Sequence, residues 1–156
     1  MMAADWLKGV EPMVRESRIK VPYSWSVGDT GSRFLTEMRD NGKLLGKRCE
    51  ACETVFVPPR KMCPRCFQDT GPWIEVGPQG RLAAFTVARY DTGLAPKTAP
   101  VAYGIIELDG ATTGLVHLLD EVAPEALVPG MRMEPVFRED RVGHILDIAH
   151  FRPVNG

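Results

Sequence analysis

The sequence lacks any apolar run approaching the ~20 residues that a helix needs to cross a bilayer. Its first ten residues include Asp5 and Lys8 and contain no apolar stretch of the kind found in secretory signals. Together, these absences predict a protein that neither enters a membrane nor is secreted. We therefore expect a cytoplasmic location.

A strong net charge is also missing. The 156 residues include 19 Lys and Arg and 20 Asp and Glu, a formal net charge of −1. Such a balance gives no overall attraction to nucleic acid or to an anionic membrane. The charge is unevenly spread, however: residues 39–65 hold seven basic and three acidic side chains, and residues 101–156 hold four basic and nine acidic ones. We expect an anionic ligand, if there is one, to bind in the first of these regions.

Motifs of catalysis are scarce as well. There is no P-loop, and no Gly-x-Gly-x-x-Gly opens a helix. The three histidines, His117, His144 and His150, fall in or beside predicted strands, and no nearby serine completes an obvious triad. The cysteines all belong to one motif, which leaves none as a nucleophile. We predict no catalytic residue, and a chain that is not an enzyme by itself.

That cysteine motif is the strongest feature present. Cys49-x2-Cys52 and Cys63-x2-Cys66 are separated by ten residues, and each pair can form a tight knuckle that directs two sulfurs to one point. In a reducing compartment this spacing favours a metal over disulfides. Four thiolates suit zinc and also iron of the rubredoxin kind, and we expect zinc. A closed four-cysteine site leaves no position for substrate, so its predicted role is structural.

The chain divides into three predicted segments. Residues 1–46 form an N-terminal arm followed by a helix, with Ser32 as its expected N-cap and Gly42 as its end. Phe34, Leu35 and Met38 would share one face of that helix. Residues 47–72 form the zinc ribbon, and residues 73–156 form a barrel.

Short strands separated by Gly and Pro signals predict the barrel. Five of them suggest a Greek-key barrel of the OB type. We also expect a short helix within residues 120–127, and an edge or a bulge at Pro135, which cannot donate to a ladder. The fold class is therefore mainly β with a small α part. The expected strands are Arg81–Tyr90, Val101–Leu108, Thr112–Leu118, Met131–Arg138 and His144–Phe151.

Several longer strings resemble one known family, the zinc-ribbon/OB-fold acyl-CoA-associated proteins. The order of helix, ribbon and barrel, with Pro-Pro-Arg inside the ribbon, is more specific than the cysteines alone. The matching region runs from about residue 31 to 153. The strings are Gly42-Lys43-Leu44-Leu45-Gly46-Lys47-Arg48-Cys49, Phe56-x-Pro58-Pro59-Arg60-x2-Cys63-Pro64, Gly80-Arg81-Leu82, Glu107-Leu108-Asp109-Gly110 and Pro129-Gly130-Met131-Arg132-Met133.

The resemblance implies a small accessory subunit that joins a larger enzyme in a hetero-oligomer and helps to hold acyl-CoA. Relatives assemble with thiolase-like enzymes, or with hydratases or aldolases. This sequence is most similar to thiolase partners, such as the small subunit of a benzoylsuccinyl-CoA-type thiolase. The reactive cysteine and histidine would then come from the thiolase-like large subunit.

Two interpretations of the basic residues stay open. CoA carries several phosphate charges, which guanidinium groups can bind in a bidentate manner. The predicted CoA contacts are Arg60, Lys61, Arg65 and Arg81, near the junction of ribbon and barrel. For any one of them taken alone, a solvated surface charge is the more common explanation, and the case for CoA rests on the four as a cluster. The alternative function is a nucleic-acid-binding module, which zinc ribbons and OB barrels also form, although the acidic barrel speaks against it.

Overall fold

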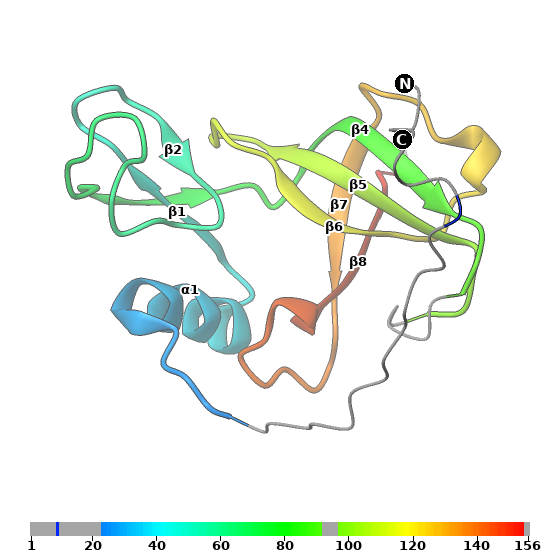
Figure 1. The fold of residues 1–156 in the computed structure, drawn as a ribbon, viewed down its shortest axis with the longest axis horizontal. Helices are drawn as coiled ribbons and strands as arrows, with labels where there is room; N and C mark the ends of the chain where they lie inside the picture. The colour runs from blue at the N-terminus through cyan, green and yellow to red at the C-terminus, as the bar shows by residue number, and fades with distance from the viewer. Residues whose placement is uncertain (1–8, 10–22, 92–96, 155–156) are drawn as a thin grey trace.

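The structure is a computed structural model that describes residues 9, 23–91 and 97–154. A small three-stranded sheet with one helix beside it leads into a closed five-stranded barrel (Figure 1). This architecture confirms the predicted fold class. The predicted N-terminal arm lies almost entirely outside the described residues.

Helix α1 spans Gly28–Asn41, and the end predicted from the sequence is confirmed. Gly42 adopts a left-handed conformation with φ 63°, and its N–H donates to the carbonyl of Met38. The prediction of Ser32 as the N-cap is wrong, because the observed N-cap lies five residues earlier and Ser32 is within the helix. Val27 is the N-cap, and Asp29 lies in the first turn, where an acidic side chain suits the helix dipole.

The ribbon sheet has the order β2-β1-β3, with β1 at Leu44–Arg48, β2 at Val55–Phe56 and β3 at Trp73–Val76. Both neighbours of β1 run antiparallel to it. Phe34 and Met38 of α1 are buried against this sheet and belong to the same core cluster as Leu44 and Leu45. The helix is therefore fixed to the ribbon by its apolar face, on which Leu35 also packs.

The barrel strands are β4 Gly80–Ala88, β5 Val101–Leu108, β6 Leu115–Leu119, β7 Arg132–Phe137 and β8 Ile148–Pro153. They close into a barrel in the order β4-β5-β6-β8-β7. β5 has the predicted bounds, and the other strands shift by one to four residues. The short helix expected at 120–127 is the 3₁₀ turn η2 at Pro124–Ala126.

Two strand starts differ from prediction for identifiable reasons. β6 begins at Leu115 rather than Thr112, because the hydroxyls of Thr112 and Thr113 bond to the ribbon backbone. β8 begins at Ile148 because His144 caps a 3₁₀ turn, η3 (Ile145–Asp147). Pro135 does lie beside an irregularity: the pairing of β7 with β8 shifts register between Val136 and Phe137.

One continuous apolar core runs through both parts of the molecule. Leu82, Ile106 and Phe151 of the barrel belong to the same buried cluster as Val57 and Val76 of the ribbon region. The ribbon is therefore packed onto the barrel and does not hang from a flexible connection. Among the described residues, no helix has the length and apolarity required to cross a membrane.

Candidate metal centre and barrel face

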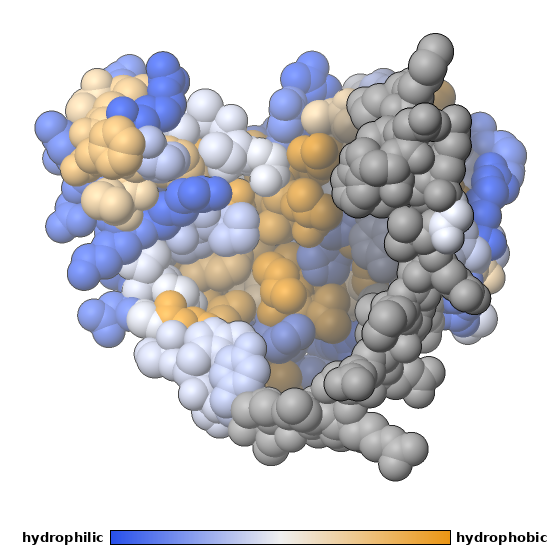
Figure 2. All heavy atoms as spheres, viewed as in Figure 1, coloured by the Kyte–Doolittle hydropathy of each residue, from blue (hydrophilic) through white to orange (hydrophobic). Residues whose placement is uncertain are grey.

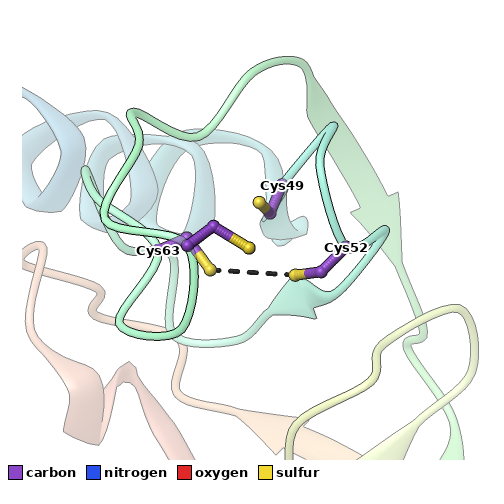
Figure 3. A group of neighbouring side chains, drawn as sticks. Cys49, Cys52 and Cys63 are labelled. Carbon is purple, nitrogen blue, oxygen red and sulfur yellow. Dashed lines mark hydrogen bonds between the residues drawn. The ribbon is translucent and has the colours of Figure 1, made fainter.

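Two knuckles of the same build bring the four cysteines together. In the first, the Glu53 N–H donates to the carbonyl of Cys49 at 2.7 Å. In the second, the Phe67 N–H donates to the carbonyl of Cys63 at 2.9 Å. All four sulfurs lie within 4.8 Å of one another. Figure 3 shows the sulfurs of Cys49, Cys52 and Cys63 directed at a common centre.

The donor set fits a structural zinc. A tetrahedral site with Zn–S distances of ~2.3 Å separates its sulfurs by about 3.8 Å. The Sγ atoms of Cys52 and Cys63 are 3.8 Å apart. Cys49 and Cys63 are buried, and Cys52 and Cys66 are partly buried. Four sulfurs fill a tetrahedral shell, so the arrangement supplies a staple and no open position for chemistry.

The thiols themselves indicate why a cation suits this centre. Hydrogen bonding to Thr54 lowers the pKa of Cys52 to about 6. The neighbouring Cys52 sulfur, burial and the other two sulfurs raise the pKa of Cys66 to about 12. Cys52 therefore ionises readily, and the closeness of the other sulfurs then opposes ionisation of Cys66. A divalent ion would remove that opposition, because metal binding requires and stabilises the thiolate form.

The four basic residues predicted to contact CoA lie in different surroundings. The guanidinium of Arg60 lies 5.9 Å from the ring centre of Phe56. Arg81, at the start of β4, forms an exposed ion pair with Glu107 of β5 at 2.7 Å. Arg65 is exposed in the second knuckle. Lys61 and Arg81 line separate hollows of the surface.

The hollow beside Lys61 measures about 370 Å³ and opens at the beginning of α1. Lys47 and Lys61 line it together with Asp29 and Asp69, so its cations and carboxylates are balanced in number. The Lys47 ammonium also lies 5.5 Å from the ring centre of Trp73, and the Arg33 guanidinium lies 4.7 Å from the same ring centre. The hollow alone therefore has no bias towards an anion.

The structure reveals an apolar barrel face that sequence reasoning missed. Register places Ala84 opposite Ile105, Thr86 opposite Tyr103, and Ile105 opposite Val116 on the outer side of β4, β5 and β6. These five side chains, which we call the barrel face, carry no charge and line a hollow of about 310 Å³. Figure 2 shows hydrophobic atoms gathered over this part of the molecule.

The barrel face is open to solvent in the described structure. The side chain of Val116 is 63% exposed and that of Ile105 is 41% exposed. Tyr103 and Val116 also line a second apolar hollow of about 230 Å³, which extends the surface towards η3. A solvated sheet face normally carries polar residues, so this one has the composition of a contact surface.

Each of the three histidines is hydrogen-bonded to a neighbouring segment of the fold. His117 is buried and its Nε2 lies 3.2 Å from the Ile145 carbonyl. Burial lowers the pKa of His117, so the ring is neutral at physiological pH. His144 lies outside every strand and caps η3 through Nδ1. His150 lies 2.9 Å from a carboxylate oxygen of Glu121, which also pairs with Arg152.

The fold and site define a class of protein: a four-cysteine zinc ribbon packed on an OB-type barrel. Comparison with known families agrees. A family model described as the rubredoxin-like zinc ribbon domain of ChsH2 matches residues 36–70. A second, described as the C-terminal OB-fold domain of ChsH2, matches residues 73–138.

The family itself follows from a relative in Methanocaldococcus jannaschii, named a DUF35 domain-containing scaffold protein. It is 33% identical over 127 residues, which cover 78% of this chain and 89% of the relative. The chain belongs to the DUF35 family of zinc-ribbon/OB-fold proteins.

Two further similarities concern proteins named for reactions. A probable enoyl-CoA hydratase alpha subunit of Thermomonospora curvata is 28% identical over 98 residues, 63% of this chain and 30% of that subunit. The solved Ltp2-ChsH2(DUF35) aldolase matches with a TM-score of 0.61 at 24% identity, covering 83% of this chain and 98% of that one. This second likeness shows the shared fold.

Proposed function

We propose that this chain is a non-catalytic accessory subunit of an acyl-CoA-processing enzyme. In this proposal it binds a thiolase-type large subunit in a hetero-oligomer. It also helps to hold acyl-CoA while a carbon–carbon bond is cleaved or formed. Zinc bound by Cys49, Cys52, Cys63 and Cys66 would fix the ribbon and take no part in the reaction.

The names of related proteins support an accessory role. One is called a scaffold protein, one a hydratase subunit, and one occurs in an aldolase with a DUF35 component. A module found with such different reactions is more simply explained as a partner of catalysts than as a catalyst. The choice of a thiolase rests on the resemblance of the ribbon and barrel strings described above.

The observation that carries the proposal is the barrel face. Val116 of β6 and Ile105 of β5 are exposed there and Tyr103 of β5 is half-buried, without a covering element among the described residues. Burying such a surface on a partner is favourable by ~25 cal/mol for each Å² of apolar area. A free-standing protein gains nothing from leaving it open.

The predicted CoA contacts support the second half of the proposal. Arg60, Lys61 and Arg65 are exposed on the ribbon. Among the residues that the structure describes, none forms an ion pair with any of the three. Their charges are thus available for phosphates. Arg81 would have to exchange its partner Glu107 for a ligand.

The test is association with the large subunit. The tagged chain is purified gently from its host, the co-purifying proteins are identified by mass spectrometry, and affinity is then measured with the separated subunits. A thiolase-type chain in near-equal amount supports the proposal. Co-purification of nuclease-sensitive nucleic acid alone, with salt-dependent binding to an oligonucleotide, would instead favour the nucleic-acid module.

Val116→Glu tests the barrel face in the same assay. Burial of an unpaired carboxylate costs several kcal/mol, so we expect affinity to fall at least ~100-fold. Val142→Glu is the matched control, because Val142 is 74% exposed and belongs to the loop between β7 and η3 and not to β4, β5 or β6. If Val116→Glu binds the large subunit as tightly as Val142→Glu and the wild type do, the barrel face is not the contact surface.

A further inference from the structure

A second apolar surface lies at the far end of the ribbon. The hairpin of residues 62–69, which carries the second knuckle, exposes Phe67 by 76% and Met62 by 53%. Figure 2 shows hydrophobic atoms at the end of the ribbon lobe, surrounded by hydrophilic ones. We call Met62 and Phe67 the ribbon tip. It is on a different part of the chain from the barrel face and shares no residue with it.

The backbone at Phe67 makes its exposure unusual. Phe67 has φ 53°, in the left-handed region that glycine occupies without strain and a bulky side chain adopts at a cost. The residue at the same place in the first knuckle, Glu53, has φ 60°. The knuckle geometry thus favours glycine at both positions. An aromatic residue occupies this position although its backbone is strained and its ring gains little from burial within the chain.

The ribbon tip is held rigidly. The N–H of Cys63 donates to the Gln68 carbonyl at 2.8 Å, and the N–H of Phe67 donates to the Cys63 carbonyl. At the base of the hairpin, the Thr70 hydroxyl bonds to the carbonyls of Arg60 and Lys61. The backbone that carries the Phe67 ring is thus already ordered, and only the few torsions of the side chain remain to be fixed on binding, which suits an interface anchor.

Charge around the ribbon tip indicates the chemistry of what it meets. Arg60, Lys61 and Arg65 flank it, and Asp69 is the single carboxylate within residues 60–69. Within the described residues these three cations have no ion-pair partner. Arg65 is the cation within the hairpin itself, between Cys63 and Phe67, whereas Arg60 and Lys61 lie at its base and stay available to CoA. Arg65 would then pair with the partner instead of with CoA. A surface that complements the tip therefore has an apolar pocket with carboxylates at its edge.

We propose that the ribbon tip is a second docking contact, in which Phe67 inserts into an acid-rimmed apolar pocket on the large subunit. This inference rests on the proposed function and adds to it the region, the anchor residue and the chemistry of the partner surface. With the barrel face, it gives the complex two separate contacts, which fix the orientation of the small subunit.

The decisive variant is Phe67→Gly. It removes the ring and relieves the left-handed strain, so zinc content stays at one per chain and the melting temperature stays equal or rises. Affinity for the purified large subunit falls at least tenfold, mainly through faster dissociation. Stability and binding therefore change in opposite directions, which a purely structural role of Phe67 would not produce.

Glu53→Gly is the matched control, since it makes the same backbone change in the other knuckle and removes only an exposed pair with Arg48. We expect its affinity to stay within twofold of the wild type. Phe67→Asn is measured in parallel, because asparagine also tolerates a left-handed backbone. If the glycine variant loses zinc, the asparagine variant shows whether loss of the ring weakens binding. Arg65→Glu should weaken binding, and the loss should shrink at high salt.

The outcomes separate the two proposals. If the wild type binds the large subunit and both Phe67 variants bind equally well, the ribbon-tip contact is overturned and the accessory role stands. Equal weakening by Phe67→Gly and Glu53→Gly would also overturn it, because the effect would then come from the knuckle backbone. If the wild-type chain binds no acyl-CoA enzyme, both proposals fail.

Discussion

Single residues in this protein often act by bonding to the backbone of another segment. The buried carboxylate of Asp147 accepts the N–H groups of Val142, Gly143 and His144 at 2.7–3.1 Å. Burial alone would raise the pKa of Asp147, but these three donors together hold it below its ordinary value of 3.8. One side chain thereby fixes the loop that connects β7 to η3.

Asp147→Asn should therefore destabilise the protein by about 1–3 kcal/mol at pH 7, because it replaces an acceptor of several N–H groups. A lowered pKa means that the ionised carboxylate stabilises the fold above pH ~3.8 and loses this effect as the pH falls through the lowered pKa. Denaturant unfolding should show the gap to wild type shrinking in acid. Asp140→Asn, at an exposed position of the same loop, should change neither value; a similar loss in both variants would contradict this account.

The proposed CoA contacts can be tested one charged side chain at a time. Arg60→Gln and Lys61→Gln should each raise the KM of the assembled enzyme for its CoA substrate about 3- to 10-fold with little effect on kcat, since each removes one charge from a phosphate. Arg138→Gln, another exposed position, is the control. Unchanged KM in both ribbon variants would remove these two residues from the CoA site.

Among the elements, the ribbon strand β2 and the residue after it are hydrogen-bonded to the turn between β5 and β6. The hydroxyl of Thr113 accepts the Val57 N–H at 2.8 Å and donates to the Val57 carbonyl at 3.0 Å. The hydroxyl of Thr112 accepts the Val55 N–H at 3.0 Å. Side chains of the barrel thus act as the missing neighbour of a ribbon strand.

Thr113→Val keeps the shape of the side chain and removes both bonds. It should cost about 1–3 kcal/mol, because it leaves backbone groups of Val57 unpaired in a partly buried place. Thr86→Val, at an exposed position of β4, should stay within about 0.5 kcal/mol of wild type. Thermal unfolding of the two variants measures this difference. Equal stabilities would mean that the Thr113 hydrogen bonds do not stabilise the fold.

The same contacts show the limits of sequence reasoning. Gly42 was a sound marker of the end of α1, since a left-handed C-cap is a local property. Thr112 looked like part of a strand, because nothing local shows that its hydroxyl bonds to a segment 57 residues away. The cysteine spacing predicted the cluster for the opposite reason: its geometry is set within two short knuckles.

At the scale of the whole molecule, the barrel face is formed by the way in which three strands pair. Residues 101–108 alternate between the barrel interior and the outside, yet both sets are largely apolar. The sequence alone therefore gave no sign that Tyr103 and Ile105 face outward beside Val116. That arrangement needs the register of three strands.

The shared core leads to a prediction about zinc. Cys63→Ser should reduce bound zinc from one ion per chain to none, and lose most of the ~10 kcal/mol that a structural zinc supplies. Because one apolar cluster joins ribbon and barrel, circular dichroism should show a single transition at a lower temperature. Ala51→Ser, at an exposed position of the first knuckle, should keep the metal. A barrel that melts unchanged without zinc would contradict the coupling.

Activity of separated and recombined subunits tests the accessory role most directly. We expect that this chain alone turns over no acyl-CoA, that the large subunit alone is nearly inactive, and that equimolar mixing restores thiolysis. We also expect that Val116→Glu prevents this recovery and that Val142→Glu does not. Turnover by this chain alone, or full activity of the large subunit without it, would contradict the account.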